Sequence, residues 1–71
     1  MPRYIVMIDS FDRNYEESGV MQPWVTAPAF DSIDEARVYA EGHRQGRRAE
    51  IHESESGEMK DARVVERFTR A

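Results

Sequence analysis

The 71-residue chain contains no cysteine. Without a thiol it cannot form a disulfide, a zinc-thiolate site, a thiolate nucleophile or a redox switch. The missing disulfides matter, because a domain of this size buries only about 60% of the surface that its unfolded chain exposes. We therefore expect one domain over residues 1–71 with a marginal core, and extra stability from another source such as self-association.

The chain also lacks a long hydrophobic run. Near the N-terminus, residues 4–8 are apolar, and Asp9 then interrupts them. Five residues are too few for the core of a signal peptide or for a membrane span, so we expect a cytoplasmic protein. Fourteen acidic residues against ten basic ones give a net charge of −4, which disfavours a grip on nucleic acid by the whole domain.

One helix is well signalled, over residues 33–44. Ser32 and Glu35 have the spacing of a capping box at its start, and Gly46 is a suitable left-handed stop after its end. Five residues fall on one side at 100° per residue and are predicted to be its buried face: Ile33, Ala36, Tyr39, Ala40 and His43. Val38 points away from that face as an isolated exposed apolar residue.

Two strands precede this helix in the prediction. Residues 3–9 have apolar side chains on both faces, which favours a central position in the sheet. Residues 24–30 are aromatic and β-branched, but Pro23 and Pro28 lack the backbone donor of a central ladder, so we expect an edge strand. Between the two lies a long polar loop, residues 10–19.

A hairpin follows the helix. Residues 48–53 alternate between apolar and polar positions, and residues 62–69 resume an extended pattern after a polar segment containing Gly57. In the second strand, Val64, Glu66 and Phe68 would share one face. A helix over residues 61–68 is the alternative.

The predicted fold is α+β, a small and mainly antiparallel sheet of three or four strands with one helix packed on one face, in the order ββαββ. Many small bacterial proteins share this order. It is a topology and carries no function by itself.

Oxygen-bearing side chains occur at alternating positions of the loop and resemble the opening ligands of a calcium loop: Asp12, Asn14 and Glu16. A calcium loop counted from Asp12 needs glycine at its sixth position and glutamate at its twelfth, where the chain has Glu17 and Pro23. We therefore expect no metal and no cofactor.

Neither histidine lies in a recognisable catalytic motif. His43 or His52 could act as a general base with Glu50 or Glu53, but one helix on a small sheet rarely forms a pocket for such a reaction. No serine lies in a nucleophile elbow, and no glycine-rich loop follows a strand. The sequence does not predict an enzyme.

Three arginines, Arg44, Arg47 and Arg48, cluster near the end of the predicted helix. Cations there complement the helix dipole, which is a sufficient structural role. The alternative is a small nucleic-acid-binding protein that uses this cluster on phosphates.

The leading hypothesis rests on apolar residues that one helix cannot cover. Met7, Val25 and Val65 are expected on the sheet face opposite the helix, with Trp24 nearby. Uncovered apolar surface usually marks a partner, unless the chain folds back over it. The sequence thus favours a non-catalytic binding or accessory module that docks on another protein or forms a homodimer through Met7, Trp24, Val25 and Val65.

Overall fold

A computed structural model of the chain describes residues 1–9 and 28–69. Within them the elements follow the order β1 (Arg3–Ile8), β2 (Ala29–Phe30), α1 (Ile33–His43), β3 (Ala49–Ser54), the 3-10 turn η1 (Met59–Asp61) and β4 (Arg63–Phe68). The predicted α+β class and the ββαββ order are confirmed.

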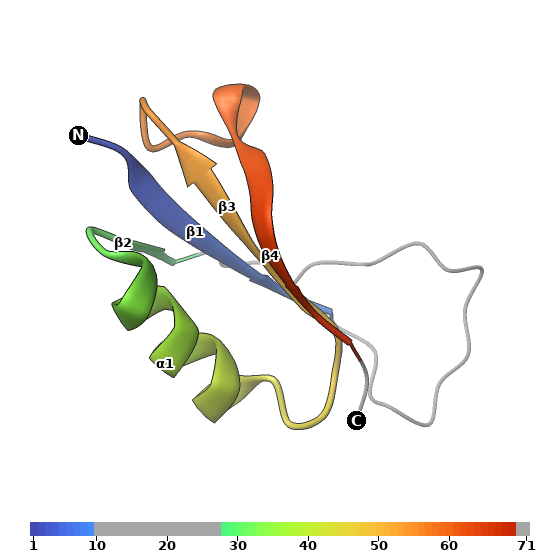
Figure 1. Cartoon of the computed structure of the whole chain (residues 1–71). Coiled ribbons are helices and arrows are strands. Elements are labelled where there is room, and N and C mark those ends of the chain that lie inside the picture. Colours follow the sequence, from blue (N-terminus) through green and yellow to red (C-terminus); the bar gives the residue numbers. More distant parts are fainter. Residues whose placement is uncertain (10–27, 70–71) are drawn as a thin grey trace.

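The four strands form one antiparallel sheet in the order β2-β1-β3-β4, and α1 crosses one of its faces (Figure 1). β1 lies between β2 and β3, in the central position that its two apolar faces predict. Opposed residues of antiparallel strands point to the same side. The pairs Val6–Ile51 and Ile8–Ala49 therefore form an apolar strip beneath the helix.

The core is built from small helix residues on branched strand residues. Ala36 and Ala40 are fully buried against Val6, Ile8 and Ile51. Alanine lets the helix lie close to the sheet. Larger side chains border this core where it meets solvent: Tyr4, Phe30, Ile33, Tyr39 and Phe68.

The ends of α1 follow the local sequence signals. The Ser32 hydroxyl accepts a hydrogen bond from the Glu35 backbone N–H at 3.2 Å, which is the predicted cap. It also donates to the Glu35 carboxylate at 3.2 Å. After the helix, Gly46 adopts a positive φ of 78°, as expected of a stop, and Gln45 precedes it with a φ of 52°.

The last strand differs from the expectation in one respect. Residues 63–68 are extended, so the helical alternative for 61–68 is wrong. Glu66 opposes Ile51 while Val64 opposes His52, which leaves Val65 as the extra residue of a β-bulge. Val64 therefore faces the same side as His52 rather than sharing a face with Glu66.

Several predicted features lie outside the described residues: the polar loop of residues 10–19, the resemblance to a calcium loop, Trp24 and Val25. For the predicted edge strand 24–30, the structure describes residues 28–30 and assigns Ala29–Phe30 as strand.

Candidate interaction surfaces

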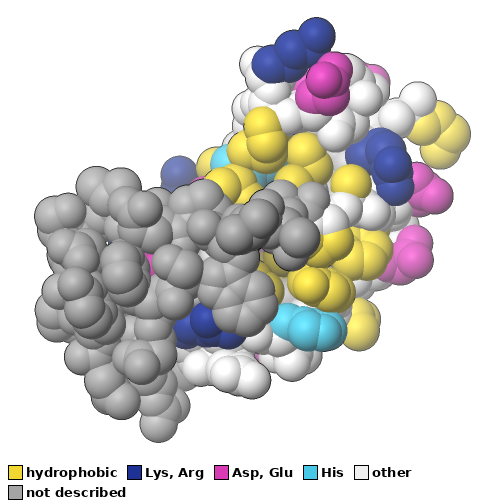
Figure 2. All heavy atoms as spheres, turned by 180° about the vertical axis from the view of Figure 1, so that it is seen from behind, with side chains coloured by type: hydrophobic (Ala, Val, Ile, Leu, Met, Phe, Trp, Pro, Cys, Tyr) yellow, Lys and Arg dark blue, Asp and Glu magenta, His cyan; other side chains and the backbone are white. Residues whose placement is uncertain are grey.

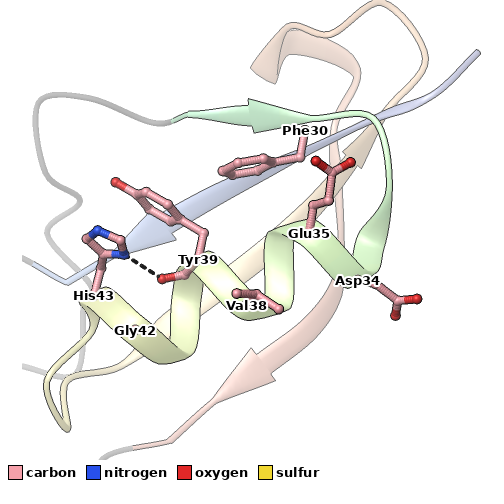
Figure 3. Close-up of a pocket in the computed structure, with 7 residues that line it drawn as sticks. All are labelled: Phe30, Asp34, Glu35, Val38, Tyr39, Gly42 and His43. Carbon is pink, nitrogen blue, oxygen red and sulfur yellow. Dashed lines mark hydrogen bonds between the residues drawn. The ribbon is translucent and has the colours of Figure 1, made fainter.

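A groove of about 620 Å³ lies beside α1 and β2. Seven residues line it, drawn in Figure 3: Phe30, Asp34, Glu35, Val38, Tyr39, Gly42 and His43. We call it the α1 groove. Its volume is in the range of sites that hold small ligands or a few peptide residues.

A row of rings forms one wall of the α1 groove. The Phe30 and Tyr39 centroids are 5.3 Å apart with the planes tilted by 45°, and His43 stacks on Tyr39 at 4.0 Å and 16°. His43 Nδ1 lies 2.9 Å from the Tyr39 carbonyl oxygen (Figure 3). Because a carbonyl oxygen only accepts, Nδ1 carries a proton. The wall is therefore held by contacts within the domain before anything binds.

The opposite wall is the outer surface of the helix. Val38 is 74% exposed, and a Cβ added to Gly42 would meet no atom within 4 Å. Val38 is not isolated, because Tyr39 and Gly42 line the same groove. Figure 2 shows hydrophobic side chains gathered beside a histidine on the face seen there. The α1 groove thus has an apolar floor with open space above it.

The groove has a carboxylate towards the start of α1. Figure 3 shows the Glu35 carboxylate on the side of the helix where Phe30 lies, while the Asp34 carboxylate points away. Asp34 instead pairs with Arg37 at 3.1 Å, and Arg37 reaches Glu66 on β4 at 2.7 Å. Glu35 is therefore the acidic group that faces the groove.

On the sheet face opposite α1, polar groups separate the residues predicted for docking. Met7 is half-buried and opposes Glu50, which in turn opposes Arg67. Val65 is 38% exposed at the bulge of β4. Since β3 lies between their strands, the structure does not bring Met7 and Val65 together.

The hypothetical histidine–carboxylate pair does form, between His52 Nε2 and Glu50 Oε1 at 3.0 Å. Glu50 also lies 3.4 Å from Arg67, and the His52 side chain is only 12% exposed. The Glu50–Arg67 contact joins β3 to β4, and the burial of His52 leaves its ring little room for a substrate.

Glu53 lies on the other face of β3, where it accepts hydrogen bonds from Tyr4 at 3.2 Å and Arg63 at 3.0 Å. Burial, and then the hydrogen bond to this carboxylate, raise the pKa of Tyr4. Glu53 is therefore not a partner of either histidine.

The side chains of Arg44 and Arg47 donate hydrogen bonds to backbone carbonyls of the same domain. Arg44 donates to the carbonyl oxygens of Arg47 at 3.0 Å and Thr69 at 2.8 Å, and its guanidinium lies 5.2 Å from the Phe68 ring centre. Arg47 is 7% exposed and donates to the carbonyls of Arg44 at 2.9 Å and His43 at 3.3 Å. Both satisfy carbonyl groups at and after the helix end.

Arg48, the third member of the cluster, pairs with the buried Asp9 at 2.7 Å. Arg44 and Arg47 thus have a structural role at the helix end, whereas Arg48 has one in its ion pair with Asp9. Binding of nucleic acid by this cluster stays a prediction.

In the part of the chain that the structure describes, no three His, Asp or Glu side chains lie close enough to hold a metal ion. No helix there is long and apolar enough to cross a membrane. The chain matches no protein-family model, and no curated protein or solved structure is significantly similar to it.

Proposed function

We propose that this domain is a non-catalytic binding module that works by protein–protein contact, and that it docks its partner in the α1 groove. One observation carries the proposal. Val38 is 74% exposed at the centre of a helix, beside a row of fixed rings and an unfilled space at Gly42. Apolar surface gathered in a groove gains free energy when a partner removes it from water.

The ring row supports a docking role because its geometry exists without a ligand. Tyr39 packs between Phe30 and His43, so a partner that contacts it does not have to immobilise it first. Fixed aromatic side chains lose little conformational entropy on binding and often dominate binding energy.

The proposal moves the docking site away from the sheet face. On that face, Ile5, two residues before Met7 on β1, is only 3% exposed and therefore offers little surface to a partner. Met7 and Val65 are separated by the charged pair Glu50 and Arg67. The α1 groove is the more continuous apolar surface among the described residues.

The chemistry of the groove supports binding rather than catalysis. Its side chains include no serine, threonine or lysine that could act as a nucleophile. The His43 ring is stacked and bound to the backbone of its own helix. We propose that the contact takes place in the cytoplasm.

A photo-crosslinking amino acid at position 38 tests this function in the native cell. We expect a protein adduct of discrete mass that disappears when Gly42→Arg fills the groove. The matched control places the same group at Lys60, whose side chain is 74% exposed on η1, and should give no such adduct. The proposal is wrong if position 38 yields no adduct, or only the products seen from position 60.

A further inference from the structure

We infer that the occupant of the α1 groove is a short extended segment of another protein, in which a basic residue and a bulky apolar residue are two positions apart. This inference rests on the proposed function and specifies the chemistry of the partner. Three features of the groove lead to it: its charge, the distance between its carboxylate and its apolar floor, and the position of His43.

The charge of the helix surface selects a cationic partner. The Glu35 carboxylate faces the groove. The other exposed carboxylates on or beside α1 are each paired with an arginine, Asp31 with Arg3, Asp34 with Arg37 and Glu41 with Arg44, so Glu35 supplies the charge that the groove presents. The whole domain carries a net charge of −4. A second copy would bring the same negative net charge and a second Glu35 to the contact, which disfavours it, whereas a lysine or arginine is attracted.

The spacing of the groove selects the pattern of the segment. Val38 and Gly42 form the floor of the groove, and the point midway between them lies five residues after Glu35. This separation is about 7.5 Å along a helix at 1.5 Å per residue. Two residues of extended chain span about 6.6 Å, and side chains two positions apart point to the same side. A cation opposite Glu35 therefore places an apolar side chain over the groove floor.

His43 marks the other end of the groove. It lies eight residues from Glu35, or about 12 Å along the helix, which matches about four residues of extended chain. With its proton on Nδ1 and directed to the Tyr39 carbonyl, the imidazole offers Nε2 as an acceptor. A hydrogen-bond donor two positions beyond the apolar residue therefore meets it. The complete pattern is cation, any residue, apolar residue, any residue, hydrogen-bond donor.

Synthetic peptides test the pattern without knowledge of the natural partner. The probe is acetyl-Gly-Arg-Thr-Leu-Thr-Ser-Gly-amide, titrated into the nitrogen-15-labelled full chain and followed by NMR chemical shifts. We expect saturable shifts confined to the α1 groove, with a Kd of about 0.1–1 mM, since the contact is only a few residues long. Replacing Arg by Glu or Leu by Ser in the peptide should each weaken binding by about fivefold or more.

Variants of Glu35 test whether its carboxylate contributes to the affinity for the peptide. Glu35→Gln keeps a side chain that suits the cap and removes the charge, so we expect affinity to fall by about two- to fivefold, the range of a single exposed ion pair. Glu35→Lys should weaken binding by about tenfold or more. Glu58→Lys, which makes the same charge change in the segment after β3, should leave affinity within about twofold. Circular dichroism confirms that each variant is folded.

Two outcomes overturn the inference. One is the absence of groove shifts with any peptide, and the other is an equal loss from Glu35→Lys and Glu58→Lys, which would indicate a general charge effect. The crosslink at position 38 tests docking in the groove independently of the peptides. A crosslinked partner together with peptides that do not bind would leave the proposed function standing and reject only the predicted peptide pattern. An adduct at twice the mass of the chain would sustain docking while showing that the occupant is a second copy.

Discussion

Arg48 donates two hydrogen bonds to one oxygen of Asp9, with Nε at 2.9 Å and Nη2 at 2.7 Å from Oδ2. The Asp9 side chain is 1% exposed and that of Arg48 is 26% exposed. The Asp9 backbone N–H also donates to the Arg48 carbonyl at 2.9 Å. Side chains and backbone together join the end of β1 to the start of β3.

Asp9→Ala should lower the free energy of unfolding by about 2–4 kcal/mol, because it leaves a partly buried guanidinium without this carboxylate. Urea denaturation measures the loss. Arg63→Ala is the control, since its pair with Glu53 is exposed, at 78% for the arginine side chain, and should cost less than about 1 kcal/mol. Equal losses from the two variants would contradict the assigned role of Asp9.

Gly42→Ala should stabilise the domain by about 0.5–1 kcal/mol, because alanine is the better helix former and its methyl group meets open space. Gly57→Ala is the matched opposite. Gly57 has a φ of 83°, and a Cβ there would lie 3.4 Å from Arg3 Cδ. We expect Gly57→Ala to lower the free energy of unfolding by about 1–2 kcal/mol. The midpoint of thermal unfolding should rise for Gly42→Ala and fall for Gly57→Ala. A shift of both midpoints in the same direction would contradict the open space assigned to Gly42 or the backbone strain assigned to Gly57.

Arg47→Met should lower the free energy of unfolding by about 1–3 kcal/mol, since it removes hydrogen bonds from a buried guanidinium to carbonyls at the helix end. Arg67→Met, at a side chain that is 70% exposed, should change it by less than about 1 kcal/mol. If Arg47→Met instead kept full stability and abolished salt-sensitive retention on single-stranded nucleic acid, the alternative function would be favoured.

Asp61 should contribute a pH-dependent part of the stability. Its carboxylate accepts from the Ser54 hydroxyl, from the Ser56 hydroxyl at 2.9 Å and from the Ser56 backbone N–H at 3.2 Å. The hydrogen bonds from Ser54 and then Ser56 lower the pKa of Asp61. The unfolded chain then binds this proton at higher pH than the native protein, so the contribution is complete above about pH 4 and is lost as the pH falls through the lowered native pKa.

The measurement is the thermal midpoint from about pH 6 to pH 2, for the native chain and for Asp61→Asn. The native chain should lose stability more steeply below about pH 4. Parallel profiles would show that Asp61 does not cause the difference.

The elements that the sequence predicted well depend on local signals. The Ser32 cap, the alanine face of α1 and Gly46 act within one or two helical turns, so residue types and spacing were sufficient. β1 was correctly placed as a central strand because both of its faces are apolar. These features need no knowledge of what packs against them.

The features that the sequence missed depend on contacts between distant segments. The bulge at Val65 changes which side of the sheet Val64 faces, and no residue type in β4 indicates that a bulge is present. Val38 was recognised as exposed, but its place beside Phe30 follows from how β2 lies next to α1. The role of Asp9 was hidden because its partner is 39 residues away.

The most direct test of the α1 groove is an NMR footprint of the nitrogen-15-labelled full chain in unlabelled extract of its native cell. Our account predicts selective broadening of the backbone signals of Val38, Tyr39 and Gly42, which is lost in the folded Gly42→Arg variant. Unchanged groove signals, or broadening confined to β4 and the sheet face opposite α1, would contradict it.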